Sequence, residues 1–156
     1  MTDDATLTFV HATALVVGEQ GILIQGRSGA GKSSLALALL AEASHHHCFA
    51  RLVGDDRIGL SQQNNRLIAR PHRSIAGSIE WRGLGICAIL HEPACVVSLA
   101  IELATEGLMQ ADRIPEATPT LCLLGVKVPL LTLRATAGSH ENSSITFRYL
   151  DLWPSR

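Results

Sequence analysis

The chain has 156 residues, 47% of them hydrophobic and 17% charged, which suits one domain with a full hydrophobic core. A formal net charge of −1 and an aromatic content of 4% supply neither a basic surface nor stacking platforms, so nucleic acid is not expected as a partner. The segment Met1–Asp4 is acidic where a signal peptide would be basic, and no long apolar run follows it. We therefore expect a single domain over residues 1–156, located in the cytoplasm and with no membrane partner.

The chain begins with a predicted hairpin. Apolar and β-branched residues favour a strand within Phe9–Val17, the turn Gly18–Gly21 follows, and Gly21–Gln25 continues as a second strand. The element that follows Gln25 is therefore fed by a hairpin rather than by a lone parallel strand.

A glycine-rich loop of the form G-x-x-x-x-G-K-[ST] follows the hairpin. Its backbone N–H groups would wrap nucleotide phosphates, its lysine would reach the outer phosphates, and its serine would face Mg2+. A helix predicted from Lys32 to about Ala43 presents its N-terminus to the same anion. The residues of this predicted ATP-binding loop are Gly26, Arg27, Ser28, Gly29, Ala30, Gly31, Lys32 and Ser33.

The predicted helix is apolar nearly all round, which favours burial between two layers. The histidine run His45–His47 then breaks the pattern, and we favour an exposed loop there over a metal site. The chain has four scattered cysteines and no C-x-x-C pair, which predicts buried, reduced thiols. They are Cys48, Cys87, Cys95 and Cys122.

Further strands are expected along the chain. Arg51–Asp56 is a short apolar strand that ends in two carboxylates, and a second hairpin pairs Ile58–Leu60 with Arg66–Ala69 before Pro71 closes it. The two glycines of Ile79–Ile86 suit a backbone pressed against another group.

Ala94–Leu103 is the most strand-like run and is predicted to lie in the middle of the sheet. The polar segment Thr105–Pro119 is a loop that could reach a neighbouring site, and Leu121–Leu124 and Val126–Leu133 are strands separated by a glycine. Apolar residues in the C-terminal tail alternate as in a strand, but a serine there could cap a helix, which we favour.

Phosphoryl transfer needs cradled phosphates, a divalent ion held by carboxylates, and an acceptor oxygen that loses its proton. Lys32 would neutralise phosphate charge and Ser33 would ligate the metal. Asp55 and Asp56 point in different directions if the backbone is extended, so one could serve the metal and the other the substrate. Glu80 would complete the protein's share of Mg2+ ligands. Spacing alone also allows the aspartates to be two acids that open a turn and Glu80 to be an ordinary surface residue.

Three segments together resemble the catalytic domain of bacterial HPr kinase/phosphorylase. They are Gly26–Ser33, Leu52–Asp56 and Ile79–Ile86, of which the last differs from the family signature I-E-I-R-G-L-G-I only at Trp81. The resemblance implies a fold similar to the nucleotide domain of phosphoenolpyruvate carboxykinase, in which a mixed sheet carries the phosphate loop after a hairpin. It implies phosphorylation of a serine of the phosphocarrier protein HPr by Mg-ATP, and phosphorolysis of that phosphoserine by inorganic phosphate.

The resemblance also assigns roles to residues. Asp56 matches the proton acceptor of the kinase direction, and Asp55 would support the metal held by Ser33 and Glu80. The catalytic set that it implies is His11, Lys32, Asp56, Arg113 and Arg134. His11 precedes Lys32 by the spacing of the family's catalytic histidine, and Arg113 lies in a D-R-[LI] element.

Departures from the family pattern accompany these matches. The chain starts at about the beginning of the catalytic domain, Ala12 stands where a glycine is usual, and the residues after Arg134 lack the usual P-G-R-N. The phosphorylase direction and the family's homo-oligomer, a hexamer, are therefore less firmly implied. Two other hypotheses stay open from the sequence: a small-molecule kinase on the same scaffold, and a nucleotide- or phosphate-sensing module with little catalysis.

Overall fold

The computed structural model describes residues 6–105 and 119–152 of the chain. Within these ranges the chain forms eleven strands and two α-helices, α1 (Lys32–His45) and α2 (Ser139–Leu152), with 3-10 turns at Arg73–Ile75 and Ala135–Ala137. The strands are β1 (Thr8–Val10), β2 (Ala12–Val17), β3 (Gln20–Gly26), β4 (Ala50–Gly54), β5 (Ile58–Gln63), β6 (Arg66–Pro71), β7 (Ser78–Trp81), β8 (Gly85–Ala88), β9 (Cys95–Ala104), β10 (Thr120–Leu123) and β11 (Val126–Arg134).

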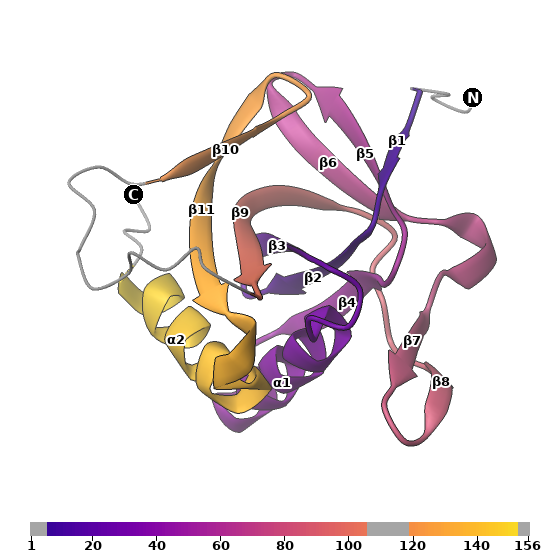
Figure 1. Cartoon of the computed structure of the whole chain (residues 1–156). Coiled ribbons are helices and arrows are strands. Elements are labelled where there is room, and N and C mark those ends of the chain that lie inside the picture. The colour runs from indigo at the N-terminus through magenta and orange to yellow at the C-terminus, as the bar shows by residue number, and fades with distance from the viewer. Residues whose placement is uncertain (1–5, 106–118, 153–156) are drawn as a thin grey trace.

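Nine of these strands form one mixed sheet in the order β1-β5-β6-β9-β3-β2-β4, extended by β11 on β9 and by β10 on β11. β9 lies at its centre as predicted and pairs with β3, β6 and β11 (Figure 1). β3 and β11 run parallel to β9, whereas the other pairs are antiparallel. The C-terminal ends of the three parallel strands therefore meet at one edge, the place where open α/β sheets bind ligands.

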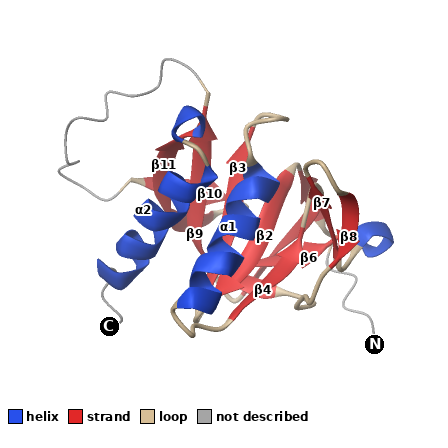
Figure 2. Cartoon of the chain, turned by 90° about the horizontal axis from the view of Figure 1, so that it is seen from below, coloured by secondary structure: helices blue, strands red, loops and turns tan. Residues whose placement is uncertain are grey.

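The two helices lie side by side on one face of the sheet (Figure 2). α1 buries Leu35, Ala36, Leu39 and Ala43, a helical stripe that packs on the sheet. Leu37 and Leu40 are only half-buried, so the prediction that α1 is buried between two layers was too strong.

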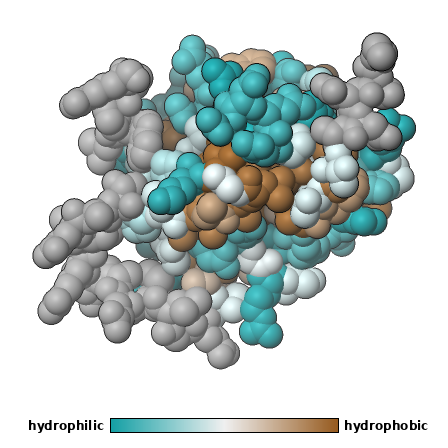
Figure 3. Space-filling view, turned by 90° about the horizontal axis from the view of Figure 1, so that it is seen from above, coloured by the Kyte–Doolittle hydropathy of each residue, from teal (hydrophilic) through white to brown (hydrophobic). Residues whose placement is uncertain are grey.

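A second apolar cluster lies on the other face, where the β5–β6 hairpin folds against β2, β3 and β9 through residues such as Leu23, Ile58 and Leu67. Figure 3 shows the molecule from the side opposite the helices, where a patch of apolar residues is surrounded by hydrophilic ones. The two clusters cover both faces of the central strands, which explains why β9 reads as a nearly continuous apolar run.

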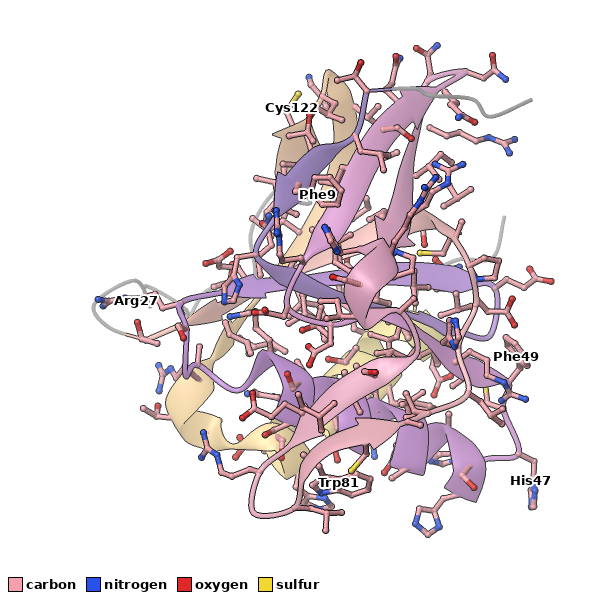
Figure 4. The ribbon with its side chains drawn as sticks, turned by 90° about the vertical axis from the view of Figure 1, so that its right-hand side faces the viewer. Phe9, Arg27, His47, Phe49, Trp81 and Cys122 are labelled. Carbon is pink, nitrogen blue, oxygen red and sulfur yellow. The ribbon has the colours of Figure 1, made fainter. Side chains whose placement is uncertain are left out.

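The first hairpin differs from its prediction in one respect. β2 and β3 pair as expected, with Thr13 opposite Ile24, but the predicted strand is interrupted at His11. The preceding strand β1 pairs with β5 instead, and Phe9 lies against His72 and Arg57 (Figure 4). This interruption places His11 between the ends of two strands rather than within the sheet.

The segment Ile79–Ile86 also departs from its prediction. It forms most of the β7–β8 hairpin, which stands away from the main sheet (Figure 1). Gly83 and Gly85 have φ values of 85° and 100°, and a Cβ at either would meet nothing within 4 Å. The glycines serve the left-handed backbone of the turn, and no other described residue of the chain makes the predicted close approach to them.

The remaining local predictions have mixed outcomes. The C-terminal tail is helical, as favoured. The thiols are free, but Cys122 is exposed and the other three are half-buried, so their predicted burial is wrong. His45–His47 are exposed as expected, although His46 has an acidic neighbour, Glu42, at 3.1 Å.

Two absences are defined for the part of the chain that the structure describes. No group of three or more His, Cys, Asp or Glu side chains there is placed to hold a metal ion. No helix there has both the length and the apolar character that a membrane crossing requires.

Candidate active site

The phosphate loop connects β3 to α1 at the edge where the parallel strands end. Gly29 and Gly31 have φ values of 82° and 101°, which glycine adopts without strain. Gly31 is also the N-cap of α1 and offers no side chain to the first N–H groups of the helix. These N–H groups and the helix dipole make the start of α1 suited to an anion.

Lys32 is the first residue of α1, near the end of this loop, and only 7% of its surface is exposed. Its Nζ donates to the main-chain oxygens of Gly26 at 2.9 Å and Arg27 at 3.0 Å. Burial lowers the pKa of Lys32 below its usual value, although Asp55 and Asp56 nearby act in the opposite direction. The ammonium is therefore held close to the loop that would receive the phosphates.

Asp55 is buried and fixed by its neighbours. Its Oδ1 accepts a hydrogen bond from Thr13 Oγ1 at 2.7 Å, and both carboxylate oxygens lie within 2.9 Å of Ser33 Oγ. The backbone N–H of Glu80 adds a longer contact of 3.4 Å. β2, α1 and β7 thus hold one carboxylate beside the serine of the phosphate loop.

Asp56 lies in a different environment although it follows Asp55 directly. Its φ of 68° is left-handed, a conformation that aspartate tolerates better than most residues. Its carboxylate is exposed, and Oδ1 lies 3.0 Å from His11 Nδ1. The two carboxylates face different partners as predicted, but a left-handed turn and not an extended strand separates them.

A cavity of about 390 Å3 unites most of the predicted site residues. Its lining includes these: His11, Ser28, Gly29, Gly31, Lys32, Ser33, Asp55, Asp56 and Glu80. Gly26 and Arg27 belong to the loop but do not line the cavity, and Figure 4 shows Arg27 projecting from the body of the molecule. Ala30 lines a smaller cavity on the other side of the loop.

Arg134, one of the two predicted arginines, is not among the described residues that line the cavity. Arg134 ends β11 at the same sheet edge as the phosphate loop, with an exposed side chain that lines neither cavity. Arg113 lies outside the described residues.

The oxygen atoms of this cavity fit Mg2+ chemistry. Mg2+ is usually held by one or two carboxylates and by substrate phosphates, and it keeps several waters. Ser33 Oγ and the Asp55 carboxylate are already adjacent, and Glu80 lines the same cavity from β7. A phosphate-loop serine beside an acidic residue is the arrangement that holds Mg2+ in P-loop enzymes.

Sequence reasoning missed two residues of the site, Thr13 and Arg82. Thr13 is fully buried in the apolar strand β2, and a lone hydroxyl in such a strand signals a buried polar partner. Arg82 lines the cavity from the turn after β7. Its position two residues after Glu80, within the segment Ile79–Ile86 that carries the family resemblance, was the available signal.

The architecture defines an α/β domain of the P-loop class, in which a hairpin-fed glycine-rich loop and paired aspartates share one cavity. Comparison with known proteins identifies the family within this class. The family described as the HPr Serine kinase C-terminal domain matches residues 4–147, and the chain belongs to this family. The predicted family and fold class are therefore confirmed.

The names of individual relatives agree with this family assignment. The chain is 32% identical over 138 residues to an HPr kinase/phosphorylase of Mycoplasma mycoides subsp. mycoides, and 34% identical over 139 residues to one of Neisseria meningitidis. Each alignment covers 82% of this chain but 42% of the relative, so the chain spans less than half the length of these curated proteins. The solved structure of the Hpr(Ser) kinase/phosphatase from Coxiella burnetii is similar with a TM-score of 0.76 and 28% identity, covering 94% of this chain and 99% of that one.

Proposed function

We propose that this chain is a protein serine kinase that uses Mg-ATP to phosphorylate an HPr-type phosphocarrier protein. The names of its relatives suggest the partner. The observation that carries the proposal is the His11–Asp56 pair at 3.0 Å on the cavity that the phosphate loop lines. A cradle for phosphates and an accessible carboxylate in one cavity are the two parts that transfer to a hydroxyl requires.

In this proposal Gly26–Ser33 binds the phosphates of ATP, and Lys32 neutralises charge on the outer phosphates. Ser33, Asp55 and Glu80 would hold Mg2+, which would supply positive charge beside the phosphates. The buried hydrogen bonds of Asp55 keep this side of the cavity in one arrangement before the substrate arrives.

Asp56 accepts the proton of the substrate serine as that hydroxyl attacks the γ-phosphorus. A serine oxygen–phosphorus bond forms, the bond between the γ-phosphorus and the bridging oxygen breaks, and ADP leaves. His11 orients the Asp56 carboxylate through its Nδ1. Both residues are exposed, which leaves room for a protein substrate. Arg113 and Arg134 are assigned to charge stabilisation through the family resemblance.

The reverse direction uses the same groups. An oxygen of inorganic phosphate attacks the seryl phosphorus, the serine oxygen–phosphorus bond breaks as Asp56 returns the proton to the serine oxygen, and the pyrophosphate that forms is released. We further propose that residues 1–156 act as one catalytic domain in the cytoplasm, within a homo-oligomer that is a hexamer by family resemblance. The activity would regulate the sugar phosphotransferase system.

The proposal is tested by measuring phosphoryl transfer from ATP to HPr. The protein is incubated with Mg-ATP and HPr, and the phosphate is located by mass spectrometry, with HPr lacking the acceptor serine as the control. Phosphoserine on HPr alone supports the proposal, and pyrophosphate released after addition of inorganic phosphate supports the reverse direction. Tight ATP binding without transfer, or transfer to a metabolite instead, would overturn it.

A further inference from the structure

The β7–β8 hairpin carries large apolar side chains that the rest of the described chain leaves uncovered. Ile86 is 79% exposed and Leu84 is 73% exposed. Neither belongs to the two apolar clusters on the faces of the main sheet, although Ile79 at the base of the same hairpin does. A single exposed apolar residue needs no explanation, but two of them on one short hairpin that stands away from the sheet indicate a contact surface (Figure 1).

The strand register places Ile86 on the face of the hairpin that serves the main cavity. Glu80 pairs with Ile86, and Ile79 pairs with Cys87. Directly opposed residues of an antiparallel pair lie on the same face with their Cβ atoms about 4.5–5.5 Å apart, and successive residues alternate between faces. Ile79 therefore anchors one face in the core, and the other face presents Ile86 beside Glu80, which lines the cavity.

Leu84 extends this surface to the turn of the hairpin. Its N–H donates to the main-chain oxygen of Trp81 at 2.9 Å, and the two residues between them, Arg82 and Gly83, line the cavity. We call Leu84 and Ile86 the hairpin patch. The patch lies next to the cavity wall but does not line the cavity.

The position of the hairpin patch favours a protein substrate as its occupant. The cavity measures about 390 Å3 and must already hold phosphates and a metal ion, so the residues that flank an acceptor serine would lie outside its mouth. A small-molecule acceptor would have no such residues to place over the hairpin. Since exposed apolar side chains are stabilised by leaving water, the residues that cover the patch would themselves be apolar.

We propose that the hairpin patch binds apolar side chains that flank the acceptor serine of the protein substrate, and that it thereby favours a protein acceptor over a small molecule. The inference rests on the proposed function, because it requires that a protein serine reaches Asp56. The hairpin then has two tasks: Glu80 faces the metal site, and Ile86 beside it contacts the substrate protein.

The test measures phosphoryl transfer by Ile86→Ser and Leu84→Ser at varied concentrations of HPr, ATP and Mg2+. Loss of one apolar side chain from the contact should raise the KM for HPr about tenfold in each variant, while the KM for ATP and the Mg2+ dependence stay at their wild-type values. Both positions are exposed, so the variants should fold. Leu90→Ser is the matched control, because Leu90 is similarly exposed, lies beyond the hairpin and lines neither cavity.

Calorimetry of HPr binding and sedimentation velocity complete the test. Wild-type KM and wild-type affinity for HPr in both variants would overturn the docking surface and leave the proposed function standing. Dissociation of an assembly by Ile86→Ser would assign the patch to a contact with a second copy of the chain and would also overturn the docking surface.

The two proposals can fail separately. A wild type that binds HPr, with weaker binding in both variants, but transfers no phosphate would overturn the proposed function alone. A wild type that neither binds nor phosphorylates HPr would overturn both.

Discussion

The two sides of the main cavity differ in how their residues are held. We call Thr13, Lys32, Ser33 and Asp55 the floor, and His11, Asp56, Glu80 and Arg82 the rim. The floor residues are buried or half-buried and hydrogen-bonded to one another or to the loop backbone, whereas all four rim residues are exposed.

The difference shows how adjacent residues acquire separate roles. Asp55 is fixed by Thr13 and Ser33, so its position is part of the fold. Asp56, one residue later, contacts a single exposed histidine and can meet a substrate without disturbing the core. We therefore expect floor substitutions to change phosphate binding and transfer or the stability of the fold, and rim substitutions to change turnover or metal use while stability is kept.

Among the floor residues, the largest effect should come from Lys32. Lys32→Met removes the positive charge next to the phosphates and should lower the rate of phosphoryl transfer about 10²–10³-fold, the loss typical of one transition-state donor. Folding should not suffer, because a buried ammonium is replaced by an apolar chain of similar length. Transfer kinetics and urea unfolding measure the two effects. Lys127→Met, at an exposed position, is the control, and nearly unchanged transfer in Lys32→Met would contradict the role of the floor.

Thr13→Val tests whether the floor hydrogen bonds stabilise the fold. The change deletes one donor to a buried carboxylate, and the free energy of unfolding should fall by about 1–3 kcal/mol. Urea denaturation measures it, with the exposed Thr136→Val as the matched control. If Thr13→Val is as stable as the control, the bond to Asp55 does not contribute to the fold.

Glu80→Gln tests the metal role of the rim. It keeps the size of the side chain but removes a charged ligand, so the Mg2+ concentration for half-maximal transfer should rise about tenfold. Stability should stay within about 0.5 kcal/mol because the residue is exposed. Glu141→Gln, exposed on α2, serves as the comparison. Identical Mg2+ dependence in both variants would exclude Glu80 from the metal site.

The smallest effect concerns pH. Burial lowers the pKa of Lys32, so between that value and the ordinary 10.5 the unfolded chain binds more protons than the folded chain. The free energy of unfolding should therefore rise with pH in this window through Lys32 alone. The free energy of unfolding of Lys32→Met is subtracted from that of the wild type at about pH 8 and at about pH 10. This difference isolates the contribution of Lys32 from those of other titrating groups. A difference that falls with rising pH would contradict the burial of the charge.

Much of this arrangement could be predicted from local sequence. The phosphate loop, the hairpin β2–β3 and the buried strand β9 follow from spacing, turn residues and apolar runs, and these patterns are local properties of the chain. The resemblance added roles for Asp56 and Glu80 that spacing alone left open, and those roles still await the tests above.

The remainder depends on contacts between distant segments. Thr13 is 42 positions from Asp55, so no local pattern reveals their hydrogen bond. The pairing of β1 with β5, which separates His11 from the hairpin, joins Thr8–Val10 to Ile58–Leu60, and these segments are far apart in the sequence. The glycines of the β7–β8 turn fit either a close approach or a left-handed turn, and only the backbone dihedrals distinguish the two.

The central claim is that a fixed floor binds the phosphates while Asp56 on the rim accepts the proton. The direct measurement is HPr phosphorylation by Asp56→Asn, made together with ATP affinity and compared with Asp151→Asn at an exposed position of α2. Loss of general-base catalysis should lower transfer about 10²–10⁴-fold, while ATP binding and the unfolding midpoint match those of Asp151→Asn. Wild-type transfer by Asp56→Asn, or loss of transfer only in step with loss of ATP binding, would contradict the account.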